Sequence, residues 1–505
     1  MQRCEPAAGG GGDAKVFAGP AAAEGSTRLA ADRVHWLAWC VGIFAWLAAW
    51  AVLWPYTGEG DAAMHYLNLR ESVQAPGAAL HAWARPGWVA LMVVPAMGGL
   101  LTARIAAAAL AAVLAWQTMA MARERGLAQP WLAGALLITQ PLFFALASDT
   151  MTEMPMALGF VLAARLWWHR RHATSAVLVS WLPLVRPEGF FLGVMWGAML
   201  LFDRRVGSVR RRVMLIPLLL IGTAAWLAVC WWWTGDPLYV LSSWSWPARS
   251  HPSYGSGSLF HHVVRWPYYC GPVLLVLFIA GLRPSWRRGM ALPWAIWLLV
   301  FVLHSILWWR GWFASVGLMR IMASTAPFTA LICLHGWHAI GRWLDRRHVE
   351  ATVKRRLALA TIIAAVGTAM LMYAMDAQHY RGFGQIEAAG YLRQSGLLGD
   401  APRVFYGDHI ALAELGLPPR SPRLVRNTWS AEQQAELYRS LPVGTVGVWD
   451  NAIARRWHHL GHDDLKALGY KPLHEVRYRP VIGLRVSGDG LERPTFRMVA
   501  YRKVR

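Results

Sequence analysis

The sequence has few charged residues, few cysteines and no evident cleavable signal. Of its 505 residues only 15% are Asp, Glu, Lys or Arg, whereas 56% are hydrophobic. A soluble protein of this length needs more polar surface, so the composition argues against one. The five cysteines follow no metal-ligand spacing and imply no disulfide framework. The first apolar block, residues 34–54, is too long for the core of a signal peptide, so we expect an uncleaved anchor.

Acidic residues are also scarce, at 28 against 50 basic ones, which gives a formal charge of +22. Such an excess can indicate nucleic-acid binding, but most of the Lys and Arg lies in short clusters between apolar blocks. These clusters occupy residues 123–125, 165–172, 204–212, 283–288 and 342–356. This is the positive-inside pattern of membrane proteins, with added attraction to anionic lipid. We therefore expect membrane lipids, and no nucleic acid, as partners.

Long apolar blocks dominate what remains. Blocks of roughly 17–25 apolar residues are typical of transmembrane helices. We predict about eleven spans, near residues 34–54, 103–121, 127–147, 155–168, 174–190, 190–202, 213–233, 268–282, 291–309, 315–338 and 357–375. The pair around 174–202 is short and is expected to form a hairpin. The fold class is a polytopic α-helical membrane protein, and the 31 Trp residues fit aromatic belts at the span ends.

The composition divides the chain into three regions. Residues 1–33 are rich in Ala and Gly and are predicted to be disordered, and residues 34–375 form the transmembrane domain, with a first outer loop at 55–86. From about residue 376 helical patterns alternate with strand-like runs, which predicts a small α/β domain over 376–505. A cytoplasmic N-terminus puts every basic cluster inside. The protein is then expected in the cytoplasmic (inner) membrane, with the C-terminal domain extracytoplasmic.

The first outer loop carries two carboxylates and a histidine directly after a predicted span. They are Glu59, Asp61 and His65, preceded by glycines that let the backbone turn. Asp61 is a candidate general base at the membrane surface, with His65 one helical turn along the same face. An alternative is that Asp61 only caps the helix that starts after it.

Two more groups of charged residues fall on the same predicted side. Asp149 and Glu153 are spaced by four and are candidates for a divalent cation, unless they only favour the dipole of the following helix. Arg186 and Glu188 lie between apolar runs at the hairpin tip, where the planar fork of an arginine suits a phosphate. Snorkelling of Arg186 to lipid headgroups is the alternative. Arg85 in the first loop is a candidate for a second cation or a polar contact, with a plain loop residue as the alternative.

The order of these motifs resembles the GT-C superfamily of integral-membrane glycosyltransferases. The resemblance is to its dolichyl-phosphate-mannose-mannosyltransferase-like and aminoarabinose-transferase-like branch. It is carried by Gly60-Asp61 to His65-Tyr66, Thr152-Glu153-Met154-Pro155, Val185-Arg186-Pro187-Glu188-Gly189, Gly235-Asp236-Pro237-Leu238-Tyr239 and the turn from Gly311 to Arg320. One departure is Ala62, which follows Asp61 where the family often has paired acids.

The resemblance implies a polyprenyl-phosphate-linked sugar as donor and an outward-facing site. Asp61 matches the catalytic base of the first loop, and Asp149 or Glu153 matches an acid that in some members is associated with a metal or the acceptor. Arg186 would contact the donor phosphate, with Arg85 in support and Glu188 orienting Arg186. A single displacement would invert the anomeric centre. Neither the sugar nor the acceptor, whether a glycan, a lipid or a protein, follows from the sequence.

Two other functions remain open at this point. A secondary transporter would place its ionisable residues near the bilayer midplane, often within inverted repeats, whereas here they lie at span ends and no repeat is convincing. A catalytically inactive membrane scaffold of the same fold is the second alternative, because a fold does not guarantee an activity.

Overall fold

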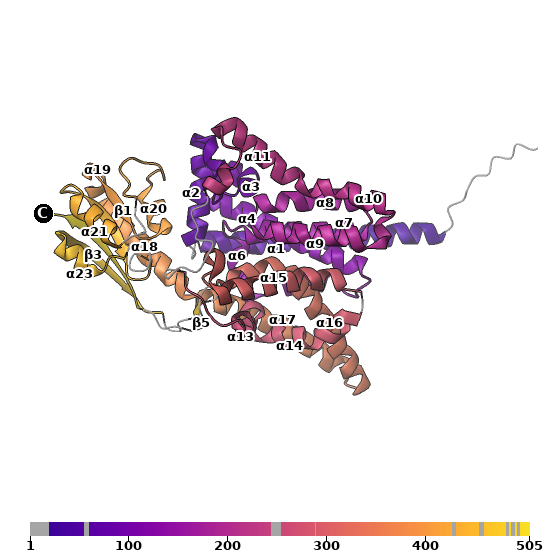
Figure 1. Cartoon of the computed structure of the whole chain (residues 1–505). Helices are drawn as coiled ribbons and strands as arrows, with labels where there is room; N and C mark the ends of the chain where they lie inside the picture. Colours follow the sequence, from indigo (N-terminus) through magenta and orange to yellow (C-terminus); the bar gives the residue numbers. More distant parts are fainter. Residues whose placement is uncertain are drawn as a thin grey trace, which may run out of the picture.

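The computed structural model shows a bundle of helices with a smaller α/β part at one end (Figure 1). The bundle is formed by residues up to Ala374, and the α/β part by the residues that follow. The structure describes the backbone of residues 20–54, 60–243, 254–287, 289–426, 431–453, 459–480, 484–485, 490–491 and 495–505. Side chains are described within these ranges from residue 36 onward, except at 377–378, 484–485 and 490–491.

Within this part of the chain, six helical segments are long and apolar enough to cross a membrane. They are α1 (Pro20–Leu53), α4 (Leu100–Glu124), the run from α10 (Val209–Leu215) through η4 (Ile216–Leu220) to α11 (Ile221–Thr234), α14 (Trp266–Arg287), α15 (Ala291–Arg310) and α17 (Ala351–Ala374). Large apolar side chains such as Val41, Val229 and Ile363 are exposed on them, as expected for surfaces that face lipid. Helix α1 begins at Pro20, so residues 20–33, where the sequence predicts disorder, have a helical backbone.

The other predicted spans form shorter or less apolar helices. The segment predicted at 127–147 is broken into α5 (Trp131–Ile138) and α6 (Pro141–Ala147), because a proline disfavours helical backbone at the residue before it. The side-chain amide of Gln140 at this break donates to the carbonyl of Ala326, 2.9 Å away. The next segments are α7 (Glu153–Trp168), α8 (His172–Trp181) and α9 (Glu188–Phe202).

The helices α8 and α9 form the predicted short hairpin, and Gly189 makes its tight tip possible. A Cβ atom at Gly189 would lie 2.4 Å from the backbone carbon of Leu182, so no larger residue fits without moving the chain. The tip itself is the 3-10 turn η2 (Leu182–Leu184). The hairpin therefore fixes where Arg186 and Glu188 lie.

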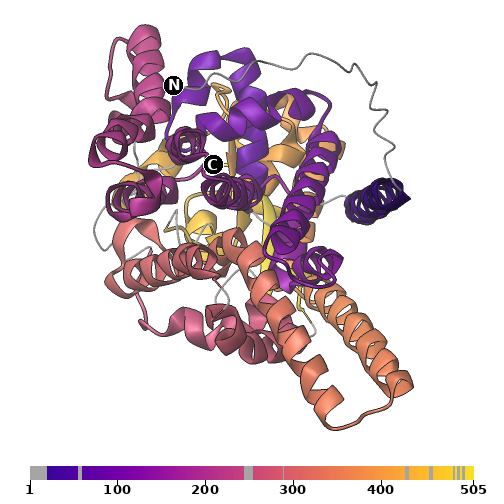
Figure 2. The same cartoon turned by 90° about the vertical axis from the view of Figure 1, so that its right-hand side faces the viewer.

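The segment predicted as a span over 315–338 starts instead with a 3-10 helix, η6 (Met319–Thr325), which leads into α16 (Ala326–Arg346). Two glycines let α16 contact α14 closely. A Cβ atom at Gly336 would lie 1.8 Å from the carbonyl oxygen of Leu277, and one at Gly281 would lie 1.9 Å from that of Ile332. Farther along, α16 and α17 project together from the edge of the bundle (Figure 2).

The C-terminal part is a four-stranded sheet with helices on both faces. The strand order is β1 (Val404–Tyr406), β2 (Val446–Asp450), β6 (Phe496–Lys503), β3 (Tyr470–Tyr478), with β1 and β2 parallel and the other pairs antiparallel. Helices α18 (Ala377–Gln394) and α20 (His409–Leu415) pack on one face through Ala388 and Leu412. Helices α21 (Ala431–Ser440) and α23 (His462–Ala467) pack on the other through Tyr438 and Leu465. The mixture of helices and strands agrees with the α/β pattern predicted for residues after 376.

Helix α2 (Gly60–Gln74) joins the two parts, because it contacts both α3 (Pro86–Met97) in the bundle and α20 in the C-terminal part. In Figure 1 it lies at the end of the bundle that faces the sheet. Its Leu67 packs in the same apolar cluster as Ala411 and Leu412 of α20.

The remaining short elements are η1 (Pro76–Leu80), η3 (Arg204–Val206), α12 (Tyr239–Ser242), α13 (His261–Val264), η5 (Trp312–Ala314), α19 (Leu397–Asp400), β4 (Leu484–Arg485) and β5 (Gly490–Leu491).

Candidate active site

Helix α2 places Asp61 in its first turn and His65 one turn later. The turn starts against the C-terminal part, since a Cβ atom at Gly60 would lie only 2.7 Å from Oδ1 of Asp408. His65 is 1% exposed, and its ring stacks on that of Trp83 with centroids 5.9 Å apart. Glu59, the other predicted acid of this loop, lies outside the described residues.

Carboxylates and guanidinium groups from four segments meet beside Asp61. Arg320 of η6 forms a hydrogen-bonded ion pair with Asp61, and its Nε lies 3.6 Å from Oε1 of Glu153. Glu153, the first residue of α7, also lies 2.7 Å from Nη1 of Arg186. Arg186 in turn contacts Glu188 at 2.9 Å. Of the residues that the sequence places on one side, namely Asp61, Asp149, Glu153, Arg186 and Glu188, these contacts join all but Asp149.

Glu153 is the centre of this network. Its side chain is fully buried, and it lies between two guanidinium groups that are themselves less than a tenth exposed. Removing one partner of a buried ion pair costs about 3–5 kcal/mol, because the other charge stays buried without compensation. The network therefore holds α2, α7, η6 and the tip of the α8–α9 hairpin in one fixed arrangement.

Asp149 lies in the same loop as Glu153 but makes different contacts. Its Oδ1 accepts the backbone N–H of Thr150, whose hydroxyl donates to the carbonyl of Ala62 in α2 at 2.7 Å. Arg104, 1% exposed, supports this loop by donating to the carbonyl of Ser148 at 3.0 Å. Asp149 thus belongs to a loop that is tied to the first turn of α2 through Thr150.

Arg85 approaches the network from the first loop. It precedes Pro86 and has a φ of 58°, in the left-handed region that few non-glycine residues adopt. Its guanidinium group donates to the hydroxyl of Thr152, which also accepts from Nη1 of Arg186 at 3.0 Å. Among the described side chains Arg85 has no carboxylate within ion-pair distance, and its buried Nε has no hydrogen-bond partner. Strained backbone thus holds a cation next to Arg186 with donors to spare.

The charges of the network shift the pKa values of the loop residues. Burial raises the pKa of Asp61, but Arg320, His65 and His409 together outweigh it and bring the pKa to about 2. Burial and the neighbouring Arg186 lower the pKa of Arg85 to about 10, although nearby carboxylates oppose this. Burial is the largest cause of the lowered pKa of Arg85, and a buried cation gains from an anion that binds beside it.

Several residues of the site were missed by the sequence predictions. Arg320 lies at the start of an apolar block, and the argument used for Arg186 applies to it equally. His304 lies inside the apolar helix α15, where an ionisable residue is unusual, and its Nε2 is 3.3 Å from Oε1 of Glu188. His409 could not be predicted in this way, because it lies far from the other residues in sequence and belongs to the C-terminal part, which contacts α2 through α20.

The surroundings of Glu153 do not fit the predicted divalent cation. Two guanidinium groups beside a carboxylate repel a further cation, and hard cations need several oxygen ligands. Within the described ranges no group of three or more His, Cys, Asp or Glu side chains is close enough to hold a metal ion. The metal role of Asp149 and Glu153 stays a prediction, and this geometry counts against it.

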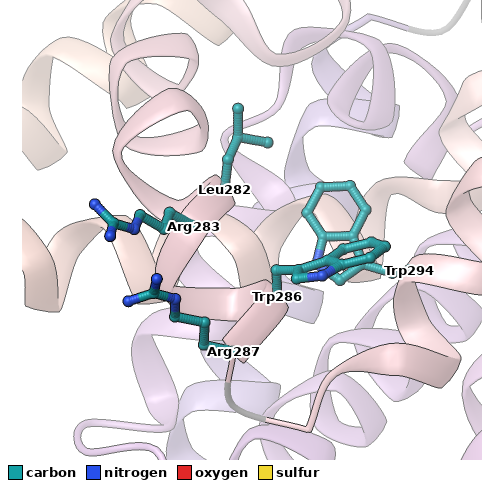
Figure 3. A pocket seen from close by; sticks show the side chains of 5 residues that line it. All are labelled: Leu282, Arg283, Trp286, Arg287 and Trp294. Atoms are coloured by element: carbon teal, nitrogen blue, oxygen red, sulfur yellow. The ribbon is translucent and has the colours of Figure 1, made fainter.

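Two surface cavities lie away from the network. One, of about 350 Å³, is lined by Leu282, Arg283, Trp286, Arg287 and Trp294 near the C-terminal end of α14. Its arginines extend to one side and its tryptophans to the other (Figure 3). The second, of about 330 Å³, lies between α1 and α5 and is lined mainly by residues of α1 from Ala38 to Trp46. Neither includes a residue of the network, so the candidate site is defined by its charges.

Comparisons with known proteins find a similar fold among solved structures but no related sequence family. No family model matches the chain, and no curated protein matches it. The crystal structure of ArnT from Cupriavidus metallidurans in the apo state aligns with a TM-score of 0.53 and 13% identity, over 91% of this chain and 98% of that chain. The structure of the same ArnT bound to undecaprenyl phosphate aligns with a TM-score of 0.47 and 13% identity, over 82% and 87%. The chain therefore has a helical fold similar to that of ArnT, and its described residues include six helical segments long and apolar enough to cross a membrane.

Proposed function

We propose that the chain transfers a sugar from a polyprenyl-phosphate donor to an acceptor on the outer face of the cytoplasmic membrane, with inversion of the anomeric centre. The fold of ArnT supports a membrane glycosyltransferase. The network supports a site for a phosphate, because Arg85, Arg186 and Arg320 converge on it. A polyprenyl tail suits a site at the end of apolar helices, since the tail stays in lipid while the phosphate reaches the arginines.

Arg85 carries the proposal. Arg186 already contacts Glu153 and Glu188, and Arg320 already contacts Asp61. Among the described residues Arg85 contacts only Thr152 and the ring of Trp83, so its remaining donors suit a phosphate. We assign it the first contact with the donor phosphate, with Arg186 behind it. The sequence analysis gave the main phosphate contact to Arg186 with Arg85 in support, and this proposal reverses the two roles.

Asp61 is the proposed base. Because it is paired with Arg320, its pKa can change when the donor binds. A donor phosphate that attracts Arg320 weakens this pair. The pKa of Asp61, which Arg320 helps to hold at about 2, then rises, because burial raises it once the cation has moved. The carboxylate becomes a stronger base only when the donor is bound, which protects the site from unproductive proton transfer.

The reaction proposed for this site is one displacement. The acceptor oxygen or nitrogen attacks the anomeric carbon, the bond from that carbon to the phosphate oxygen breaks, and the electron pair leaves with the polyprenyl phosphate. Asp61 takes the proton that the acceptor loses, while Arg85 and Arg186 stabilise the charge that grows on the phosphate. The leaving phosphate needs no proton, so one carboxylate is sufficient.

Binding of undecaprenyl phosphate to the full-length protein in lipid nanodiscs tests the proposal. Losing a charge-assisted contact costs about 1.5–3 kcal/mol, so Arg85→Gln is expected to weaken binding about 10-fold to 150-fold. Arg70→Gln is the matched control, because Arg70 is an exposed residue of α2 that contacts Tyr66. Equal affinity of the unmodified protein for undecaprenyl phosphate and for undecaprenol, which lacks the phosphate, would contradict the proposal.

A further inference from the structure

The C-terminal end of α14 carries two exposed arginines, Arg283 and Arg287. They are one helical turn apart and extend to the same side of the cavity that they line (Figure 3). Among the described side chains neither has a carboxylate within ion-pair distance, whereas Arg165 and Lys354 at the ends of other helices each have one. Like charges at this spacing repel each other, so an anion bound between the two arginines would relieve the repulsion.

Two tryptophans form the other side of this cavity of about 350 Å³. Trp294 of α15 is buried, and its Nε1 donates to the hydroxyl of Ser285 at 3.2 Å. The ring of Trp286 is exposed and packs edge-on against that of Trp294, with centroids 5.8 Å apart. The cavity therefore has a cationic side and an aromatic side, and contacts between two helices fix the aromatic side.

An exposed apolar face of α14 leads to the cavity. Val276 and Ile279 are exposed, as is Leu282, which lines the cavity, and their spacing of three residues places them on one face. On another face Gly281 lets the helix approach the backbone of α16 closely. Helix α14 is long and apolar enough to cross a membrane, so its exposed face suits lipid chains and its basic end suits their headgroups.

We propose that this cavity binds the headgroup of a phospholipid with a net negative charge. The lipid phosphate lies between Arg283 and Arg287, whose planar guanidinium groups suit its oxygens. The glycerol part covers the ring of Trp286, and an acyl chain runs along Leu282 and Ile279. Basic pockets between membrane helices bind anionic lipid headgroups in this way in other proteins.

The chemistry of the lining selects the kind of lipid. Among the described residues the five that line the cavity include no acidic one, so the amine of a zwitterionic headgroup finds no partner there. This favours phosphatidylglycerol over phosphatidylcholine. A phosphate free in solution has the right charge, but it lacks the chains that would cover the exposed face of α14.

The cavity is separate from the candidate active site. Helix α15 has Trp294 at the cavity and His304 beside Glu188 of the network, ten residues or about 15 Å farther along the helix. The basic cluster at 283–288 is predicted to face the cytoplasm, whereas the sugar donor is proposed to bind on the outer face. Lipid binding at this cavity therefore requires a membrane but no sugar transfer.

A second arginine pair with the same spacing provides a matched control. Arg342 and Arg346 are exposed near the end of α16, with the exposed Trp343 beside them. The guanidinium group of Arg347 lies over the ring of Trp343, and neither of the two cavities described above includes Arg342 or Arg346. If general attraction between cations and the membrane surface were sufficient, both arginine pairs would contribute equally to lipid binding.

Native mass spectrometry of the full-length protein in detergent, titrated with phosphatidylglycerol, measures the affinity of the site. One Arg near a headgroup contributes about five-fold, so Arg283→Gln combined with Arg287→Gln is expected to weaken binding about 30-fold. Arg342→Gln combined with Arg346→Gln is expected to leave the affinity unchanged. All four side chains are exposed, so both double variants should melt at the same temperature as the unmodified protein.

Cross-linking locates the bound lipid. Phosphatidylglycerol with a diazirine on its acyl chain is expected to label α14 between Val276 and Trp286, and the label should be lost in the Arg283 and Arg287 double variant. Label on other helices alone would overturn the site. Equal affinity for phosphatidylglycerol and phosphatidylcholine, unchanged affinity in that double variant, or an equal loss in the control pair would do the same.

Competition with sn-glycerol 3-phosphate distinguishes a lipid from a soluble phosphate. The site is expected to keep phosphatidylglycerol when glycerol phosphate is present at the same concentration, because the acyl chains add to the binding. Displacement under these conditions would show that the headgroup alone is recognised and would overturn a lipid site. None of these measurements uses a sugar donor, so their failure leaves the proposed sugar transfer in place, and failure of sugar transfer leaves the lipid site in place.

Discussion

Replacing Glu153 by Gln should weaken the fold and strengthen phosphate binding at the same time. Glu153 is buried between Arg186 and Arg320, so the change removes one negative charge shared by two cations. Losing a partner from a buried pair costs about 3–5 kcal/mol. Arg186 keeps Glu188 and Arg320 keeps Asp61, which places the expected loss near the lower end, at about 3 kcal/mol.

The same change raises the net charge of the site by one unit. A unit charge about 8 Å from a phosphate, at an effective dielectric constant of about 20, contributes about 2 kcal/mol. This corresponds to about 30-fold tighter binding of undecaprenyl phosphate. Thermal melting in detergent and binding in nanodiscs measure the two effects separately.

The control for this experiment is Glu436→Gln, which makes the same chemical change at an exposed ion pair with Arg439. Exposed pairs contribute about 0–1 kcal/mol, so neither stability nor binding should change measurably. Weaker binding of undecaprenyl phosphate in Glu153→Gln would refute the electrostatic reasoning. An unchanged melting temperature would refute the buried network.

Three further outcomes follow from the same contacts. Asp61→Asn should abolish sugar transfer while undecaprenyl phosphate still binds, measured by product release and by binding in nanodiscs; unchanged turnover would remove Asp61 from the mechanism. Because the pKa of Asp61 in the fold is about 2, below its ordinary 3.8, its ion pair stabilises the protein above pH 4 and this contribution is lost as the pH falls through about 2. Melting curves of Asp61→Asn should therefore depend less on pH in that range than those of the unmodified protein, and parallel curves would contradict the pair. Gly60→Ala should loosen the contact with Asp408 and cost about 1–3 kcal/mol, seen as faster proteolysis between α17 and α18, and unaltered cleavage would contradict the close approach.

The sequence predicts the helices of this protein better than the positions where they are interrupted or begin. Long apolar runs gave the helices α4, α15 and α17, because hydrophobic length is a local property. The break between α5 and α6 required reading Pro141 inside such a run as a helix boundary. The late start of α16 depends on the 3-10 helix η6, which hydropathy does not distinguish from a helix start.

The candidate site was predictable in part, because the position of a charged residue at the end of an apolar run is also a local property of the sequence. Charged residues at the ends of apolar runs pointed to Asp61, Glu153 and Arg186, and the structure brings them together. The lone arginine at the start of η6, Arg320, carried the same signal. The packing of α20 against α2, the helix that carries Asp61, was not predictable, because it joins segments hundreds of residues apart.

Sugar transfer measured directly tests the central claim. The full-length protein in vesicles, given a panel of undecaprenyl-phosphate monosaccharides and an extract of cell-envelope glycans and lipids as acceptors, is followed by mass spectrometry. We predict that one donor is consumed, that undecaprenyl phosphate is released, and that one acceptor gains the mass of the sugar, with none of these changes in Asp61→Asn. Consumption of no donor, or uptake of a solute into the vesicles without any transfer, would contradict the assignment as a glycosyltransferase.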